Sequence, residues 1–503
     1  MEYLPFDHRQ SIDPADLPLL TPEELGESLG QALEDGWRLL ALFGLPEDAP
    51  ACGAPASGPV RPVSLCCILA HDATHCLAAM RTPPVERYPS LTLRTPQTHY
   101  FEREIHEQWG VEPEGHPWLK PVRRIPDTTP SPYPFYRVDG GEVHEVAVGP
   151  VHAGIIEPGH FRFQCYGEEV MHLEIALGYQ HRGMEALLLQ GPALRRVPLA
   201  ECIAGDSSIA HATAHCVLWE RLCGLDVSPR AQLLRRIALE LERLANHCGD
   251  LGAIAGDTGF LPTSSWNGRI RGDFLNITAL LCGNRFGRGL LAYGGVRQGL
   301  DAAQCEDMAG RVRAAGRDAR GAVDVMLESA SVLDRLQGTG AVDAAQARQL
   351  GLLGVPARAC GLDVDARFYA PLANLTLPDG PCLEKSGDVL ARSLVRSREL
   401  DMALQLVQDD LAALASLPEE GPGLQALPPL PPHRLAVALV EGWRGEICHV
   451  AVTGADGQLL ACKVYDPSFR NWPGLALALR GEQISDFPLC NKSFNLSYCG
   501  HDL

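Results

Sequence analysis

Long stretches with helical periodicity dominate the second half of the chain. Apolar residues recur there at spacings of three and four, which places them on one face of an α-helix. The stretches with this pattern are 208–224, 228–254, 299–334 and 386–416. The second and third exceed the average helix length. Because long amphipathic helices normally bury their apolar faces against one another, the pattern predicts a helical bundle.

β-Strands are predicted on both sides of this bundle in the sequence. From residue 142 onward, apolar and polar residues alternate around Gly and Pro turns in EVHEVAVGP and HFRFQCYGEEVMHLEIALG, a pattern typical of strands. Near the C-terminus, HRLAVALVEGWRGEICHVAVTGADGQLLACKVYD has one apolar run on each side of GADG, which is typical of a hairpin turn. The helical domain is therefore expected to carry flanking strands.

The first 125 residues predict a small α+β domain. Thr21 occupies an N-cap position and Glu24 follows three residues on, which is the capping-box arrangement at the start of a helix. The run VSLCCILA predicts a buried strand. A Pro- and Gly-rich stretch, PDTTPSPYPFYRVDGG, comes next. We therefore divide this α+β chain into a small domain over 1–125, a linker over 126–141 and a large, mostly helical domain over 142–503.

Composition narrows the class of protein. The chain has 503 residues, of which 46% are hydrophobic and 21% charged, as in ordinary globular proteins. A formal net charge of -19 argues against nucleic acid as a partner, because phosphate contacts need clustered Lys and Arg. No window approaches the roughly 18–20 apolar residues of a membrane span. The N-terminus also lacks the pattern of a signal peptide, so we expect a cytosolic chain that spans no membrane.

Cysteine and glycine spacing argues against locally built cofactor sites. The chain has 17 cysteines but no Cys-x-x-Cys pair, so a zinc or iron-sulfur site made from local pairs is not expected. Neither the Gly-x-Gly-x-x-Gly pattern after a strand nor a phosphate-binding Gly-x-x-x-x-Gly-Lys loop is present. We therefore expect no nucleotide to bind directly to this chain.

The segment GYQHRGMEALL carries the first candidate for chemistry. It places His181, Arg182 and Glu185 at a strand-to-helix junction, with Glu185 in the first helical turn, where the helix dipole favours a carboxylate. If buried, such a carboxyl has a raised pKa suited to passing protons. The alternative interpretation is a structural salt bridge at the start of a helix.

Two histidines and a charged segment have competing interpretations. His211 and His215 lie four residues apart and so share one helical face. They are either metal ligands or residues of the core or of an interface, and the second interpretation is favoured because no acidic ligand accompanies them. The segment EREIHEQWGVEPEGHPWLKPVRR is dense in charged and aromatic residues. It predicts a solvated or partner-facing surface, with anchors at Trp109, His116 and Trp118.

These segments resemble two known families in order along the chain. YFEREIHEQWGVEPEGHPWLKPVR resembles the signature of the 30 kDa subunit of respiratory complex I, which is fused into the large subunit of formate-hydrogenlyase-type hydrogenases. The remainder resembles the complex I 49 kDa subunit and the large subunit of group 4, energy-converting nickel-iron hydrogenases. The matching stretches include GPVHAGIIEPGHFRF, GYQHRGMEALL, AGDSSIAHATAHCVLWERL, ELERLANHCGDLGAIAGDTGF, GLLGVPARACGLDVDAR, SGDVLARSLVRSREL, VEGWRGEICH, DPSFRNWPGLALAL and DFPLCNKSFNLSY.

The departures from the hydrogenase pattern concern the metal ligands. In those enzymes a Cys-Gly-x-Cys pair precedes a family histidine. Matching that histidine to His211 puts Ala204 and Ser207 in place of the two cysteines. The second pair lies near the C-terminus, where Cys490 and Cys499 are too far apart in this chain. Because nickel and iron need correctly placed thiolates, we expect this chain to bind no metal.

The resemblance also bears on quinone. Complex I 49 kDa subunits carry a His-Pro-x-x-His-Gly loop whose second histidine resembles a quinone ligand, whereas this chain has HAGIIEPGHFRF, the hydrogenase form. His152 matches the first histidine of that loop. The resemblance implies a quinone cavity at the lost metal position, lined by His152, His211 and Glu185.

The implied function is that of a subunit in a membrane-associated, complex I-like oxidoreductase. It would couple electron transfer to quinone or another acceptor with proton or other ion translocation, without a nickel-iron centre of its own. Glu185 and Arg182 would be the catalytic pair, with Arg182 keeping the Glu185 carboxylate ionised. If the complex oxidises NADH, the NAD-binding site would lie on another subunit.

The resemblance implies partners as well. A small iron-sulfur subunit would carry the clusters, antiporter-like subunits would form the membrane arm, and this chain would lie peripherally on the cytoplasmic side of the inner (plasma) membrane. Two alternatives remain. The chain is either the catalytic large subunit of a nickel-iron hydrogenase, or an architectural subunit with no redox role.

Overall fold

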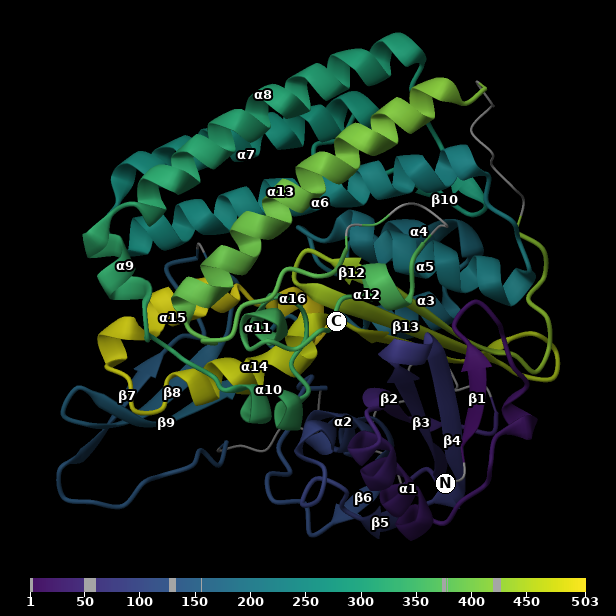
Figure 1. The fold of residues 1–503 in the computed structure, drawn as a ribbon. Coiled ribbons are helices and arrows are strands. Elements are labelled where there is room, and N and C mark those ends of the chain that lie inside the picture. Colours follow the sequence, from purple (N-terminus) through teal and green to yellow (C-terminus); the bar gives the residue numbers. More distant parts are fainter. Residues whose placement is uncertain are drawn as a thin grey trace.

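The N-terminal part of the chain forms an antiparallel sheet packed against two helices. The structure is a computed structural model that describes residues 3–48, 60–125, 133–154, 156–372, 377, 379–418 and 427–503. The sheet has the strand order β1-β4-β3-β2, and Figure 1 places it below the rest of the molecule. The elements of this part are β1 (Leu4–Asp7), α1 (Pro22–Glu34), β2 (Arg38–Leu45), β3 (Val63–His71), β4 (Cys76–Val85), β5 (Arg87–Pro89), α2 (His99–Trp109) and β6 (Glu112–Glu114), of which β5 and β6 form a separate parallel pair.

Local sequence signals in this part are confirmed. The Thr21 side chain accepts a hydrogen bond from the Glu24 amide at 3.2 Å, and the Glu24 carboxylate accepts one from the Thr21 amide at 2.8 Å. This reciprocal pair is the capping box that starts α1. The run VSLCCILA forms β3, which lies between β2 and β4 and is buried along nearly its whole length.

A three-stranded meander and two short helices follow. The strands are β7 (Val143–Val148), β8 (His160–Tyr166) and β9 (Glu169–Ala176), and the helices are α3 (Met184–Gln190) and α4 (Ala193–Ala200). The predicted linker lies partly outside the described residues, namely at 126–132. In its described remainder, the Tyr136 amide donates to the Glu174 carboxylate of β9 at 2.7 Å. The domain limits at 125 and 142 stay predictions.

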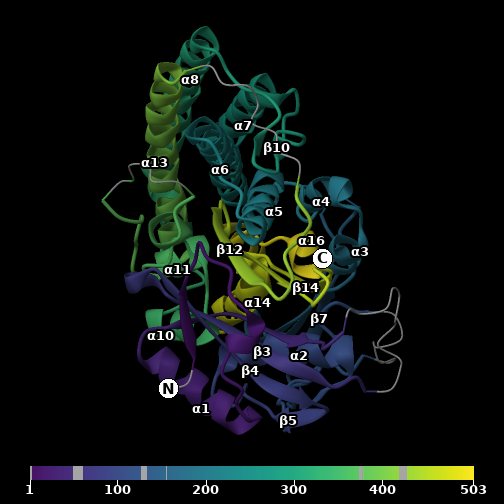
Figure 2. The same cartoon turned by 90° about the vertical axis from the view of Figure 1, so that its right-hand side faces the viewer.

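Four long helices run side by side in the bundle, which forms the upper layer in Figures 1 and 2. They are α6 (Pro229–Asp257), α7 (Leu261–Cys282), α8 (Ala302–Leu327) and α13 (Val389–Ser416), with α5 (Ser208–Cys223) beneath them. The helices predicted at 208–224, 228–254 and 386–416 are confirmed within three residues. The one predicted at 299–334 is wrong as a single helix, because α9 (Ala330–Leu336) starts anew after α8. The apolar spacing continues through this break and so conceals it.

A second sheet lies between the bundle and the N-terminal sheet (Figure 1). Its strands are β12 (Leu435–Gly442), β13 (Gly445–Thr453) and β14 (Leu459–Tyr465), in that order. The GADG turn between β13 and β14 is confirmed, but the apolar run before it forms two strands rather than one. Every residue of β12 and β13 is buried, so no alternation of polar and apolar residues marked their boundary.

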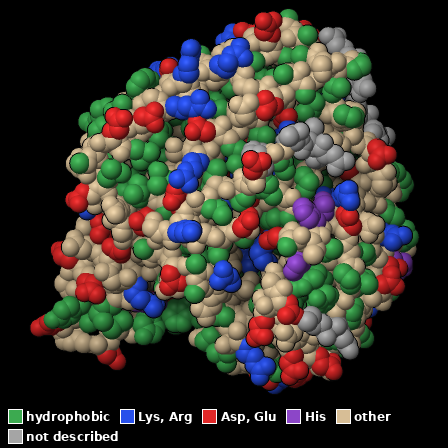
Figure 3. Space-filling model, in the orientation of Figure 1, with side chains coloured by type: hydrophobic (Ala, Val, Ile, Leu, Met, Phe, Trp, Pro, Cys, Tyr) green, Lys and Arg blue, Asp and Glu red, His purple; other side chains and the backbone are tan. Residues whose placement is uncertain are grey.

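Short elements complete the described fold. They are β10 (Leu291–Ala292), β11 (Gly295–Val296), α10 (Ala344–Leu350), α11 (Gly354–Ala359), α12 (Ala366–Tyr369), α14 (Pro467–Ala478), α15 (Phe487–Phe494) and α16 (Tyr498–Asp502). Across the part of the chain that the structure describes, no helix combines the length and apolar character needed to cross a bilayer. Acidic and basic side chains are interspersed over the bundle on the face drawn in Figure 3.

Candidate functional site

Glu185 lies where the N-terminal part of the chain meets the second sheet. Gly183, with φ of 67°, turns the backbone into α3, and Glu185 follows in its first turn. The Glu185 carboxylate lies 2.7 Å from Lys463 Nζ on β14 and accepts the Val464 amide at 3.0 Å. Gln108 of α2 donates to the same carboxylate at 3.3 Å. Three elements far apart in the sequence therefore converge on this side chain.

Two further charges join Glu185 and Lys463 in what we name the junction cluster, composed of Glu104, Arg123, Glu185 and Lys463. Glu104 lies 3.1 Å from Lys463 Nζ and 2.7 Å from Arg123 Nη2. Burial alone would raise the pKa of Glu104, but Lys463 and Arg123 outweigh it and hold this pKa at about 2. Burial also opposes the charge on Lys463, yet Glu104 and Glu185 raise its pKa. Two cations thus balance two carboxylates.

The part of the charged segment in α2 is buried, so the prediction of a solvated surface is wrong there, and the predicted partner anchors at Trp109, His116 and Trp118 stay predictions. Glu102, Arg103, Glu104 and Glu107 are all buried. The Glu107 carboxylate accepts backbone amides from residues 122, 123 and 125, and Glu102 accepts those of residues 91 and 92. These side chains hold loop backbone that would otherwise lose its hydrogen bonds on burial. The buried charged side chains of α2 therefore make contacts inside the protein.

A cavity of about 270 Å³ opens beside the junction cluster. Its wall includes Gln108 and Trp109 from α2, and Glu185, Leu189 and Lys463 from the other side. An apolar cavity with a few convergent polar groups is the usual form of a small-molecule or proton-exchange site. Neither His152 nor His211 lines this cavity, so the predicted common cavity for these histidines and Glu185 is not formed there.

Arg182 is placed differently from the prediction. Its guanidinium donates to the carbonyl oxygens of Cys202, Ile203 and Cys499 at 2.7, 2.8 and 3.0 Å. It therefore ties the turn before α5 to α16, and Lys463 takes the predicted role of cation beside Glu185. The turn at Gly183 points the side chains of Arg182 and Glu185 in different directions. Their closeness in the sequence gave no sign of this.

The position of the hydrogenase thiolates holds other side chains. Ala204 is fully buried, and Arg444 binds the neighbouring turn, with Nη1 2.6 Å from Asp206 Oδ1 and 3.3 Å from Ser207 Oγ. Across from this turn, burial and Glu157 raise the pKa of the Cys499 thiol to about 12. A methyl, a hydroxyl and a paired carboxylate do not supply the soft anionic donors that nickel-iron centres require.

The donor set therefore does not fit a nickel-iron centre. Among the described residues, no group of three or more His, Cys, Asp or Glu side chains is arranged to hold a metal ion.

His211 and His215 lie in the core of the large domain. His211 Nε2 lies 3.1 Å from the Asp466 carboxylate, and His211 Nδ1 lies 3.2 Å from His449 Nε2. One helical turn on, His215 Nε2 lies 3.0 Å from the Tyr293 hydroxyl. His152 is elsewhere, with its Nε2 2.9 Å from the Gly159 carbonyl oxygen. Sequence reasoning did not find His449, Asp466 or Tyr293, because they come from distant segments.

A second group of charges lies deeper, between α6, α13 and β12. We name it the ionic core, and its members are Arg358, Asp365, Arg367, Glu399 and Glu441. Arg358 Nε lies 2.7 Å from Glu399, and Arg358 Nη1 lies 2.7 Å from Glu441. Burial raises the pKa of Glu441 to about 7 even though Arg358 opposes this.

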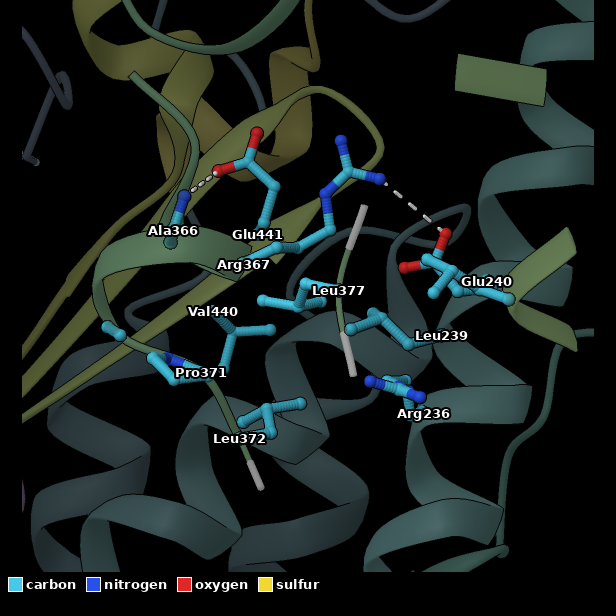
Figure 4. A pocket seen from close by; sticks show the side chains of 12 residues that line it. Arg236, Leu239, Glu240, Ala366, Arg367, Pro371, Leu372, Leu377, Val440 and Glu441 are labelled. Carbon is cyan, nitrogen blue, oxygen red and sulfur yellow. Dashed lines mark hydrogen bonds and ion pairs between the residues drawn. The ribbon is translucent and has the colours of Figure 1, made fainter. Parts of the chain in front are cut away.

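Figure 4 shows the edge of the ionic core at a small cavity. This cavity, of about 30 Å³, is lined on its polar side by Arg236, Glu240, Arg367 and Glu441. Such a volume holds about two water molecules. The dashed lines in Figure 4 mark the bond from the Ala366 amide to Glu441 and the ion pair of Arg367 with Glu240.

Glu242 predicts a pH dependence of stability. Burial raises its pKa to about 8, although the amides of Ile209 and Ala210 donate to it and lower it. Because this folded pKa lies above the unfolded one, stability is full at low pH and is lost as pH rises through 8. By pH 9 the wild type is expected to have lost on the order of 2 kcal/mol of its free energy of unfolding. Glu242→Gln is expected to keep this contribution.

Thermal unfolding of the full chain at pH 5 and pH 9 measures this difference. Exposed Glu23→Gln is the matched control and should follow the wild type. An equal loss of stability between pH 5 and pH 9 in the wild type and in Glu242→Gln would contradict the raised pKa of Glu242.

Comparisons with known proteins identify the family of this chain. The family described as respiratory-chain NADH dehydrogenase, 49 kDa subunit, matches residues 257–428, and that of the 30 kDa subunit matches residues 63–135. Formate hydrogenlyase subunit 5 of Escherichia coli (strain K12) is 32% identical over 439 residues, covering 82% of this chain and 76% of the relative. NADH-quinone oxidoreductase subunit 4 of Thermus thermophilus is 28% identical over 370 residues, covering 69% and 90%.

A solved structure shares the fold. It comes from a membrane-bound sulfane sulfur reductase, an archaeal respiratory membrane complex, and has a TM-score of 0.65 at 24% sequence identity. The similarity covers 73% of this chain and 100% of the other. The predicted architecture, a helical domain of the complex I 49 kDa type with small flanking sheets, is confirmed.

Proposed function

Since the chain belongs to the family that unites the complex I 49 kDa subunit with the large subunits of formate-hydrogenlyase-type hydrogenases, we propose that it is a subunit of a membrane-associated, complex I-like oxidoreductase. In this complex it couples electron transfer toward quinone or another acceptor with ion translocation. Residues 1–125 act as the 30 kDa-like part and residues 142–503 as the 49 kDa-like part.

The junction cluster is the observation that carries this proposal. Glu185 sits at a cavity and is paired with Lys463, which in turn contacts Glu104. In such a balanced set, adding or removing one nearby charge changes how strongly the carboxylates attract a proton. A redox group that gains an electron nearby supplies that change. The cluster therefore suits the step at which electron transfer drives movement of a proton.

The same proposal assigns the redox groups to partners. The turn at 204–207 lacks thiolates, so iron-sulfur clusters belong to a small partner subunit, and antiporter-like subunits form the membrane arm. The chain itself lies peripherally on the cytoplasmic side of the membrane. The rival proposal, a hydrogenase catalyst, requires a nickel-iron centre, and Ala204 and Ser207 do not support it.

Isolation of the intact complex tests this function. The complex is purified through an affinity tag on this chain, its subunits are identified by mass spectrometry, and nickel and iron are measured per chain. We expect a small subunit with Cys-x-x-Cys motifs, polytopic membrane subunits, several iron atoms and no stoichiometric nickel. Nickel at one atom per chain would establish the hydrogenase alternative, and recovery of a lone monomer would contradict both.

A further inference from the structure

A row of hydrogen-bonding side chains runs through the core beneath the bundle. It begins at Asp466, continues through His211 and His449, and reaches His215 and Tyr293. His211, His449 and Asp466 are at most 1% exposed, and His215 is fully buried. Tyr293, in the β10–β11 turn, is only partly buried. The row thus connects a buried carboxylate, which also accepts the Ser468 amide at 2.8 Å, with the edge of the domain.

The hydrogen-bond pattern fixes the ring protons in half of the row. The Asp466 carboxylate accepts only, so His211 Nε2 carries a hydrogen toward it. In a neutral His211 ring, Nδ1 is then an acceptor, and His449 Nε2 donates to it across 3.2 Å. His449 Nδ1 is left as a free acceptor in the core. This atom has no hydrogen-bond partner in the described residues.

The other half of the row mirrors this arrangement. His215 Nε2 meets the Tyr293 hydroxyl at 3.0 Å, while His215 Nδ1 is also buried without a partner. The rings of His215 and His449 face each other edge-on, with centroids 6.3 Å apart. Buried polar atoms of this kind are normally satisfied by a protein group or by an ordered water.

We propose that these five residues form a proton relay from Tyr293 to Asp466, with one water between His215 and His449. The Tyr293 hydroxyl passes its proton to His215 Nε2 as it takes one from solvent, so that no tyrosinate forms, because burial raises the pKa of Tyr293. His215 releases its Nδ1 proton through the water to His449 Nδ1. His449 then passes its Nε2 proton to His211 Nδ1, and His211 passes its Nε2 proton to Asp466. One proton enters at the surface and one arrives on the carboxylate.

Charge and burial suit this role. A relay ring must be neutral, so that one nitrogen accepts while the other releases. Burial lowers the pKa of His215 to about 3, and burial with the neighbouring histidines lowers that of His449 far below its usual value. Burial would raise the pKa of Asp466, but His211 and Arg444 outweigh it. The row thus ends on a charged acceptor beside the turn at 204–207.

The relay rests on the proposed function for its purpose but not for its test. The relay supplies a proton route to Asp466, and this route is separate from the junction cluster around Glu185. Its chemistry is a property of the full-length chain and requires neither the partner subunits nor a known electron donor. Failure of the relay and failure of the proposed function are therefore distinguishable.

Hydrogen exchange of the ring N–H groups tests the relay. The full chain is labelled with ¹⁵N-histidine, transferred to D₂O, and the ring N–H signals of His211 and His449 are followed by NMR. In the wild type both should exchange faster than the backbone amides of α5 around them. Tyr293→Phe removes one oxygen, and His215→Phe keeps an aromatic ring stacked on Trp219. Each is expected to slow exchange at least about tenfold, since only local opening then admits solvent.

A matched control deletes a buried hydroxyl elsewhere. Tyr88→Phe lies in the N-terminal part of the chain and should leave the exchange of both rings unchanged. Thermal melting of all variants verifies the fold. Unchanged exchange in Tyr293→Phe, or equal slowing in Tyr88→Phe, would overturn the relay, because protons would then reach His449 by general opening of the core.

Discussion

Replacing Arg358 by methionine is expected to lower the free energy of unfolding by about 3–5 kcal/mol. The guanidinium is fully buried and lies within 2.7 Å of both Glu399 and Glu441, and 3.6 Å from Asp365. These carboxylates raise the pKa of Arg358 despite its burial. Removing the cation leaves buried negative charge without its partner, which costs far more than an intact buried pair contributes.

Denaturant unfolding of the full chain measures this loss, and its pH dependence identifies the cause. Uncompensated carboxylates bind protons as pH falls, so the deficit of Arg358→Met should shrink from pH 8 to pH 5. Adding Glu441→Gln should recover about 1–2 kcal/mol, because one buried charge is removed with it.

Arg311→Met is the matched control for this experiment. Arg311 pairs with Asp307 at 2.8 Å on the surface of α8, with both side chains more than half exposed. Such a pair contributes little, within about 0.5 kcal/mol. If Arg358→Met proves as stable as Arg311→Met, the ionic core does not stabilise the fold as argued.

The ionic core also marks the limit of what the sequence predicts. Helical spacing and the capping box at Thr21 act over a few residues, so α1, α5, α6 and α13 were predictable from local pattern. The members of the ionic core come from α11, α12, α13 and β12, and the distance between Arg358 and Glu441 in sequence is 83 residues. No local pattern encodes such a meeting.

The same reason explains which residues of the candidate site could be predicted from the sequence and which could not. Glu185 was found because a carboxylate in the first turn of a helix follows a recognisable motif, GYQHRGMEALL. Its cation, Lys463, lies 278 residues further on, whereas the nearby Arg182 turned out to bind backbone carbonyls instead. Burial of α2 was likewise hidden, since its charged residues pair with loops and strands that fold against it only in the complete structure.

Glu185→Gln is expected to abolish most ion translocation by the assembled complex while the complex still forms. The amide keeps an oxygen for the Val464 amide, which Glu185 now accepts at 3.0 Å, so the local backbone is retained. It can neither hold a charge against Lys463 nor take up and release a proton. Removing a group that transfers protons typically costs about 10²–10⁴ in rate.

The complex in sealed vesicles, driven by its own donor, gives two readouts for this variant. Proton uptake per electron should fall at least about tenfold, and it should fall further than electron transfer itself. Glu114→Gln is the control, because Glu114 pairs with Arg87 on the surface, where their side chains are 48% and 68% exposed. Unchanged pumping in Glu185→Gln would remove the role assigned to the junction cluster and favour an architectural subunit. A parallel fall in Glu114→Gln would point instead to damaged assembly, since that ion pair lies outside the cluster.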